Sequence, residues 1–255
     1  MSHYPVIVCT DNPADIEAKL APFDENVEVC QDCQEGEDCK QDPECGNPQA
    51  KWDWWVVGGR WGGYFPHKPR QEPHVIMPEK QWSSPDLKAG YCDGGPKFAL
   101  DLDRMRQEEM DEARERYAEW TKLTAGTPDA LPWSTFAENI SEGNGYTIQQ
   151  ARKEYAAQPR IKALEASDRF RYMMDDPVPL FQVPEALYVE RGRAQAVPGW
   201  GVLTLDGRWM EQGSMGWWGM NDATEGSKIG YWEAANAYIE SLPDETFLIC
   251  VDCHI

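Results

Sequence analysis

The sequence predicts an α+β protein with a small antiparallel sheet core of ferredoxin-like type, formed by both ends of the chain around a large helical insertion. The 255-residue chain opens with a strand-like segment and a helix, and it closes with a hairpin, a helix and a strand. The central part of the chain is instead rich in charged residues, and its apolar residues recur at helical spacing. We therefore expect residues 1–92 and 196–255 to form the core and residues 93–195 the insertion.

The N-terminal end shows a strand followed by a helix. Residues 4–10 are rich in β-branched and apolar side chains, which favour a strand. Asn12 is a candidate helix cap and Pro13 fits the first turn, while Ile16 and Leu20 supply an apolar stripe.

The C-terminal end shows a hairpin, a helix and a strand. Asp206-Gly207 between the apolar runs 201–205 and 208–210 is a strong hairpin signal. Residues 231–242 have helical spacing, and residues 246–253 form a strand pattern. We expect the two end strands to pair in one antiparallel sheet.

The central part of the chain has helical periodicity. Residues 101–123 carry a stripe at helical spacing, and residues 147–166 predict a second helix that is interrupted near Pro159. The intervening residues 125–145 are rich in Gly, Pro, Ser and Asn, which predicts a loop. Three prolines predict an extended course over residues 175–184.

The formal net charge of −20 bears on partners. It argues against nonspecific nucleic-acid binding, because phosphate neutralisation needs clustered Lys and Arg. A basic partner, a divalent cation, mimicry of a nucleic acid, or simple solubility remain open. The chain shows no signal-peptide pattern and no apolar stretch of roughly 20 residues, so we expect a cytoplasmic protein without a membrane span.

Four cysteines lie close together within residues 30–45: Cys30, Cys33, Cys39 and Cys45. Four thiolates can close a tetrahedral site, and a structural zinc ion would supply folding energy that this polar segment lacks. Free thiols or disulfide bridges are the alternatives. The spacing therefore predicts a structural zinc site without an open position for catalysis.

Eight of the 12 tryptophans lie in two clusters that each contain Gly-Arg-Trp. The rings can stack on a flat ligand, and the arginines can hold an anion such as phosphate in bidentate fashion. Cation–π stacking of the arginines and an irregular Met–Trp core are the structural alternatives. The candidate ligand-binding residues are Trp54, Arg60, Trp61, Arg208, Trp209, Trp217 and Trp218.

Three polar residues are candidates for catalysis or metal binding. In a terminal strand, Asp252 and His254 project to one face and can act as an acid–base pair or bind a divalent metal. Asp53 lies among tryptophans, with Lys51 or Arg60 as its expected partner. The alternatives are a frayed terminus and a buried structural Asp–Arg pair.

Several strings together resemble uncharacterised proteins of bacteriophages and actinobacteria. The strings are Asn47-Pro48-x-Ala50-Lys51-Trp52-Asp53-Trp54 with Gly58-Gly59-Arg60-Trp61, Leu205-Asp206-Gly207-Arg208-Trp209 with Met215-Gly216-Trp217-Trp218-Gly219, and the terminal Val251-Asp252-Cys253-His254-Ile255. The resemblance covers both ends of the chain and is weak through the insertion. It implies a bacterial or host cytoplasm as the setting and brings no assigned reaction.

Two functions follow as hypotheses. The first is a protein that binds a small anionic aromatic ligand such as a nucleotide, with metal-assisted phosphoester hydrolysis as the reaction if it is an enzyme. The second is a non-enzymatic acidic interaction protein that blocks a basic host or defence factor, with the tryptophans as core and hot spot.

Overall fold

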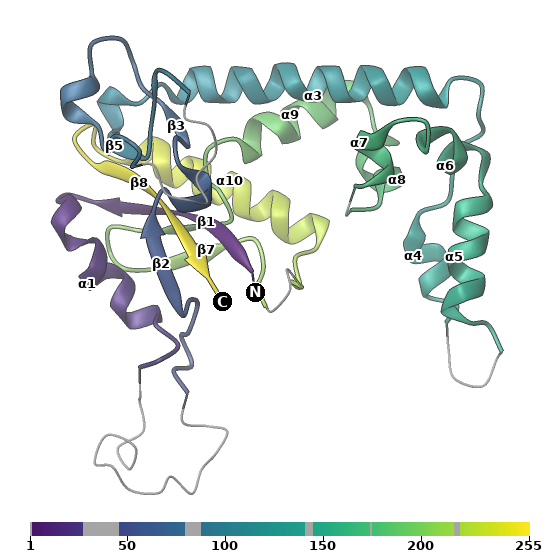
Figure 1. Cartoon of the computed structure of the whole chain (residues 1–255), viewed down its shortest axis with the longest axis horizontal. Helices are drawn as coiled ribbons and strands as arrows, with labels where there is room; N and C mark the ends of the chain where they lie inside the picture. Colours follow the sequence, from purple (N-terminus) through teal and green to yellow (C-terminus); the bar gives the residue numbers. More distant parts are fainter. Residues whose placement is uncertain (1, 28–45, 80–87, 141–144, 174, 217–219) are drawn as a thin grey trace, which may run out of the picture. The chain divides into compact units, whose positions relative to one another are not determined.

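A computed structural model describes residues 2–27, 46–79, 88–140, 145–173, 175–216 and 220–255 (Figure 1). The protein is mixed α/β and divides into two compact units. One unit joins Met1–Arg106 to Ala194–Ile255, and the other is Gln107–Arg193. Residues 93–106, predicted to belong to the insertion, lie in the sheet unit because residues 94–96 pair with the last strand.

The sheet is built around the two ends of the chain. Its strand order is β2-β8-β1-β6-β7, and β5 also pairs with β8. These strands are β1 (His3–Thr10), β2 (Trp54–Val57), β5 (Gly94–Pro96), β6 (Gly201–Leu203), β7 (Trp209–Glu211) and β8 (Phe247–His254). A separate pair consists of β3 (Phe65–Pro66) and β4 (Tyr91–Cys92). Both chain ends meet at one edge of the sheet unit (Figure 1).

The sheet is mixed, so the prediction of a purely antiparallel sheet is wrong. Strand β8 pairs antiparallel with β1 along its whole length, from His3 opposite His254 to Thr10 opposite Phe247. Strand β6 pairs parallel with β1. The reason is the entry point of β6: the Trp200 amide donates to the Pro5 carbonyl at 2.8 Å, so β6 starts beside the beginning of β1. The ferredoxin-like assignment stays a prediction.

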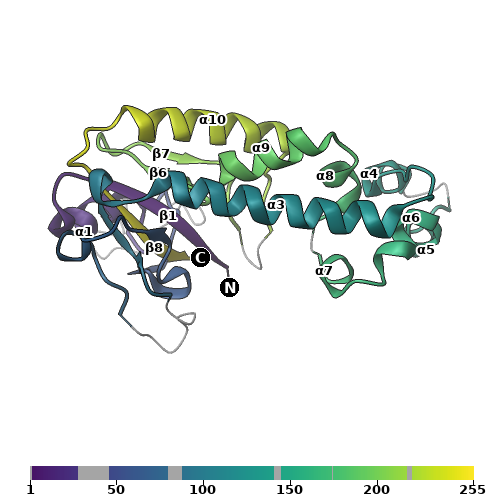
Figure 2. The ribbon, with the colours of Figure 1, turned by 90° about the horizontal axis from the view of Figure 1, so that it is seen from above.

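Helices cover both faces of the sheet. Ile7, Cys9, Leu248 and Cys250 share a buried cluster with α10 (Glu225–Ser241), which runs along one side of the sheet (Figure 2). The alternate positions of the same strands pack with α1 (Ile16–Leu20), Phe23 and Trp52 on the other side: Tyr4, Val6, Val8, Ile249, Val251 and Cys253. Burying one such aliphatic side chain contributes roughly 1.5–3 kcal/mol, and β1 and β8 gain this stabilisation on both faces.

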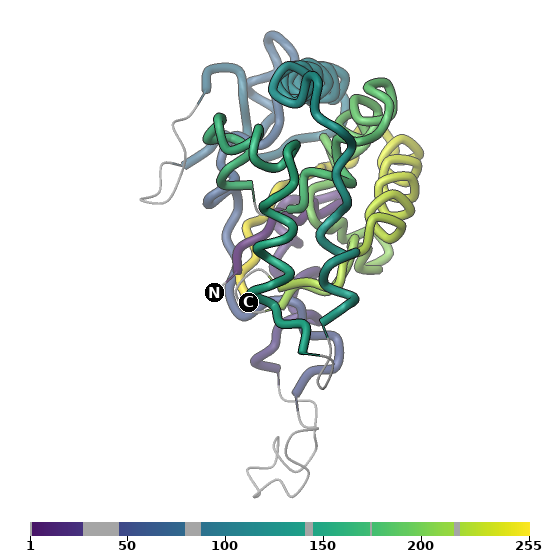
Figure 3. The backbone as a smooth tube through the Cα atoms, turned by 90° about the vertical axis from the view of Figure 1, so that its right-hand side faces the viewer, coloured from purple at the N-terminus to yellow at the C-terminus, as the bar shows by residue number. Residues whose placement is uncertain are grey.

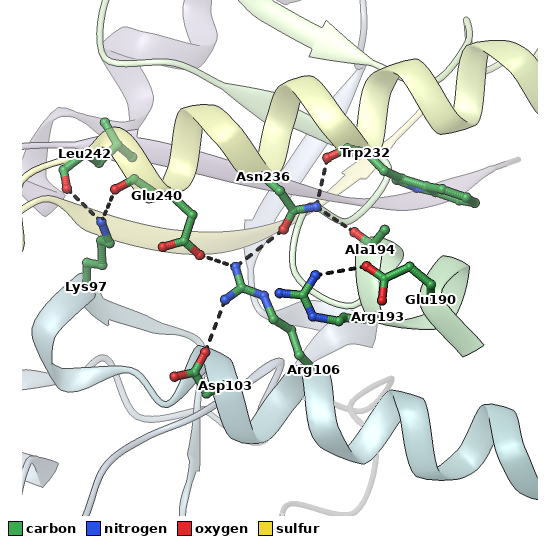
Figure 4. Close-up of polar contacts among 10 residues, drawn as sticks. All are labelled: Lys97, Asp103, Arg106, Glu190, Arg193, Ala194, Trp232, Asn236, Glu240 and Leu242. Atoms are coloured by element: carbon green, nitrogen blue, oxygen red, sulfur yellow. Dashed lines mark hydrogen bonds and ion pairs between the residues drawn. The ribbon is translucent and has the colours of Figure 1, made fainter. Parts of the chain in front are cut away.

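Arg106 fastens the first turns of α3 (Leu102–Thr124) to α10 (Figure 4). Its guanidinium contacts the carboxylate of Glu240 and lies 3.5 Å from Asn236 Oδ1 and 3.3 Å from Asp103 Oδ1. The Asn236 amide in turn donates to the carbonyls of Trp232 and Ala194. One buried cation therefore anchors the start of α3 within the sheet unit.

The second unit is helical around an aromatic core. Trp120 stacks on Phe181 with ring centroids 5.1 Å apart, and Phe170 and Leu164 complete the buried cluster. The helices are shown from teal to green in Figure 3: α4 (Trp133–Ala137), α5 (Ile148–Ala157), α6 (Pro159–Leu164), α7 (Asp168–Arg171), α8 (Pro177–Phe181) and α9 (Glu185–Gln195). The predicted break at Pro159 is confirmed. The extended course predicted for residues 175–184 is wrong, because the Asp176 side chain caps α8.

Short 3-10 turns complete the described structure: Pro13–Asp15, Ala21–Phe23, η3 (Gly59–Trp61), Glu72–His74 and Lys97–Ala99. Asn12 caps the first of them, as predicted. Over the described ranges, no helix combines the length and apolar character that a membrane crossing requires.

Candidate functional site

Three side chains form one row across the sheet, at the edge where both chain ends meet. His254 of β8 lies opposite His3 of β1 on one side and opposite Trp54 of β2 on the other. Residues directly opposite each other in antiparallel strands share a face. Asp252, two residues before His254, lies on this same face, as the period of two predicted.

Each histidine of the row is held by its own aspartate. His3 Nδ1 lies 2.9 Å from Asp252 Oδ1, and His254 Nδ1 lies 2.5 Å from Asp53 Oδ1. An ionised carboxylate only accepts hydrogen bonds, so it fixes the hydrogen on Nδ1 and leaves Nε2 of each ring available. The two imidazole centroids are 4.8 Å apart. The arrangement therefore places two oriented imidazoles side by side.

A glycine turn covers Asp252. Gly58 and Gly59 have positive φ angles of 71° and 55°, and the Arg60 amide donates to Asp252 Oδ2 at 2.9 Å. A Cβ on Gly59 would lie 2.5 Å from Asp252 Oδ2. Glycine is thus required at both positions for the close approach of the backbone to a carboxylate.

Asp93 is a second buried carboxylate beneath the same turn, and it was not among the predicted site residues. Its exposed fraction is 3%, and it accepts a hydrogen bond from the Gly63 amide at 2.6 Å. A Cβ on Gly58 would lie 2.3 Å from its Oδ2. Burial raises the pKa of Asp93, the Gly63 hydrogen bond lowers it, and Glu79 raises it further. A single Asp between Cys and Gly gives no local sign of this role.

Three predicted ligand-binding residues are exposed at or next to this site: Trp54, which is part of the row, and Arg60 and Trp61 of the turn that covers Asp252. Trp54 is 49% exposed, and its ring lies edge-on to His3 with centroids 6.1 Å apart. Arg60 and Trp61 are exposed on η3, next to the amide that holds Asp252. Within the described part of the chain, the cation–π pairs involve Lys88, Arg104 and Arg160, so stacking does not occupy the Arg60 guanidinium.

The two Gly-Arg-Trp turns do not meet. Leu203 lies opposite Val8, so the hairpin that carries Arg208 follows the far end of β1. His3 is five residues back along β1, about 17 Å away at 3.3 Å per residue. Trp209 packs against Phe23 with centroids 4.9 Å apart, and its Nε1 donates to Glu211. Arg208 and Trp209 therefore cannot contact the same bound ligand as Arg60 and the histidine row.

The partner of Asp53 also differs from the expected one. Lys51 forms an ion pair with Glu211 at 2.6 Å, and the side chain of Asp53 is bound by His254. His3 completes the site, although in the sequence it is an isolated histidine with no spacing signal. The signal that identifies His3 is the predicted antiparallel pairing of the chain ends, because such pairing sets residue 3 beside residue 254.

Carboxylates dominate the surroundings of the row. Asp24 and Glu25 lie next to the His254–Asp53 pair: burial, Asp53 and Asp24 raise the pKa of Glu25, while His254 lowers it. The described groups that can offset this negative charge are the two imidazoles of the row and Arg60 of the adjoining turn. An anionic ligand at this site therefore needs protonated imidazoles, Arg60 or a divalent cation to offset the negative charge.

Six predicted site residues lie outside the described residues: Cys30, Cys33, Cys39, Cys45, Trp217 and Trp218. Among the residues that are described, no group of three or more His, Cys, Asp or Glu side chains is placed to hold a metal ion. The described cysteines Cys9, Cys92, Cys250 and Cys253 are buried free thiols. Burial raises the pKa of Cys9 and of Cys92 to about 12, which argues against thiolate chemistry at these two positions.

Comparisons of this chain with family models, with curated proteins and with solved structures gave no match.

Proposed function

We propose that the row of Trp54, His254 and His3 binds a small anionic aromatic ligand of nucleotide type and cleaves a phosphoester bond in it. The observation that carries the proposal is the pair of imidazoles 4.8 Å apart, each oriented by its own carboxylate. A core histidine needs one hydrogen-bond partner, but a matched pair at a partly exposed sheet edge suits proton transfer in both directions.

The chemistry needs one neutral and one protonated ring. The neutral imidazole accepts a proton from water at Nε2 while the water oxygen forms a bond to phosphorus. The imidazolium donates its Nε2 proton to the leaving oxygen as the phosphorus–oxygen bond breaks. Asp252 and Asp53 orient the rings and stabilise the imidazolium. Trp54 stacks the base and Arg60 binds the phosphate.

A divalent metal is the alternative occupant of the two Nε2 atoms, which could then not act as acid and base; within the described residues, no group of three or more His, Cys, Asp or Glu side chains is placed to hold it. Metal-bound histidines commonly donate one ring hydrogen to a carboxylate, as His3 and His254 do, and present the other nitrogen to the ion. A cation would also offset the carboxylates around the row. Metal-assisted hydrolysis is therefore the alternative to the acid–base mechanism, and the proposal also includes a structural zinc ion on the four cysteines and a cytoplasmic, phage-type or actinobacterial setting.

The test combines binding and turnover. Nucleoside monophosphates, cyclic nucleotides and dinucleotides are titrated by tryptophan fluorescence and assayed for hydrolysis, with Mn²⁺ and with EDTA. His3→Ala and His254→Ala should each lower kcat by about 10²–10⁴-fold with little change in Kd. Trp54→Leu should weaken binding by about tenfold, since stacking of one base contributes roughly 1–3 kcal/mol.

His74→Ala is the matched control, because His74 is exposed and contacts Phe98 outside the row. Wild-type turnover that survives in the double variant His3→Ala, His254→Ala would refute the acid–base roles. Absence of any nucleotide response in the wild-type protein, with salt-sensitive capture of a basic protein, would instead favour the acidic interaction protein.

A further inference from the structure

The helical unit contains a cavity of about 470 Å³ that the proposed function does not use. This volume lies in the usual range for small-molecule sites, roughly 300–1,000 Å³. Trp133 of α4 and Tyr155 of α5 form one wall, with ring centroids 5.8 Å apart and planes at 87°. Ile161, Leu164 and Phe170 extend the apolar lining. The cavity thus offers ring faces and edges to an apolar body.

The charged groups of the lining are mostly acidic. Three of them are carboxylates, Glu165, Asp175 and Asp176, and one is a cation, Arg171. Arg171 is already committed, because its guanidinium lies 3.4 Å from Asp168 and donates to the Glu165 carbonyl. The cavity therefore has negative charge that its own arginine does not neutralise.

Asp176 is the carboxylate that the structure holds most firmly in place. Its carboxylate accepts hydrogen bonds from the Tyr155 hydroxyl at 2.6 Å, the Trp133 amide at 2.5 Å and the Val178 amide at 3.0 Å. All three donors are neutral, so they orient the carboxylate without cancelling its charge. Burial and Asp176 raise the pKa of Tyr155, which keeps its hydroxyl protonated as a donor.

We infer that this cavity binds a small organic cation, an ammonium or guanidinium group on an aromatic or alkyl stem. Aromatic walls attract a cation through the negative faces of their rings, and nearby carboxylates add to that attraction. An anionic ligand would instead be repelled. The helical unit thus favours a ligand of opposite charge to the one proposed for the histidine row, and the two sites can be tested separately.

The experiment uses the full-length protein and three probes of matched shape: 2-phenylethylammonium, 2-phenylethanol and 3-phenylpropanoate. Isothermal titration calorimetry should give affinity for the ammonium about tenfold above the alcohol, and no binding of the carboxylate. Trp133→Leu should reduce the ammonium affinity about fivefold. The Trp133 backbone bond to Asp176 does not depend on that side chain, so the capping of α8 is preserved.

A second, independent test removes the two exposed carboxylates of the lining, Glu165 and Asp175, which form the rim of the cavity. Glu165→Gln with Asp175→Asn should lower the ammonium affinity about fivefold and leave the alcohol unaffected. The control, Glu138→Gln with Glu185→Gln, removes the same charge from exposed positions of this unit outside the lining. Equal binding of ammonium and alcohol, or an unchanged affinity in the rim variant, would overturn the inference. Binding of a lysine- or arginine-rich peptide without binding of the free amine would also overturn it, in favour of a partner protein.

Discussion

Replacement of Gly59 by alanine tests whether the glycine turn exists to seat Asp252. The added Cβ would lie 2.5 Å from Asp252 Oδ2 and 2.7 Å from Asp252 Cβ. Asp252 is 1% exposed and is held by His3 and by the Arg60 amide, so it has no space to withdraw. The φ angle of 55° costs an alanine about 1–2 kcal/mol. Overpacking adds about 1–3 kcal/mol, and a strained Arg60–Asp252 hydrogen bond about 1 kcal/mol.

We therefore expect Gly59→Ala to lower the free energy of unfolding by about 3–6 kcal/mol in urea denaturation followed by circular dichroism. Gly207→Ala is the control in the same unit. Gly207 has a φ angle of 82°, but a Cβ added there would meet nothing within 4 Å, so only the backbone cost of about 1–2 kcal/mol applies. Equal destabilisation by the two substitutions would refute the argument that the turn is shaped around the carboxylate.

Two further outcomes follow from buried charges. Arg106→Met should lower stability by about 1 kcal/mol, seen as a Tm lowered by about 2–4 °C, because the methionine keeps the apolar stem but loses the contacts to Glu240 and Asn236. An unchanged Tm would show that the cost of desolvating Arg106 cancels the stabilisation from its contacts. Burial raises the pKa of Asp93, so the carboxyl group of Asp93 keeps its proton to higher pH in the folded state than in the unfolded chain. Stability in urea should fall as pH rises from the unfolded pKa through the folded one, and Asp93→Asn should remove this decline; an identical pH profile would contradict it.

The elements that the sequence predicted well depend on local patterns. The apolar run after the Pro243-Asp244 turn predicted the terminal strand, and the period of two predicted the shared face of Asp252 and His254; the structure has both. The Asp206-Gly207 turn predicted the hairpin of β6 and β7. These features follow from backbone geometry over a few residues, so the neighbouring sequence contains the information.

The parts that the sequence did not predict depend on pairing between distant segments. Parallel pairing of β6 with β1 carries Arg208 to the far end of the sheet, and no local pattern distinguishes this pairing from the antiparallel one. The roles of His3 and Asp93 likewise depend on which strand or turn packs above them. Charge and spacing identified candidate residues, but register decided which of them meet.

The central position of β8 has a consequence for the order of folding. The contact between His3 and Asp252 spans 249 residues, and both neighbours of β1 come from residue 201 or later. During synthesis β1 therefore has no strand to pair with until most of the chain has been made, whereas residues 107–193 form a contiguous unit with local contacts. The helical middle is expected to fold first, and the two oriented imidazoles come together only in the last step, when β8 closes the sheet.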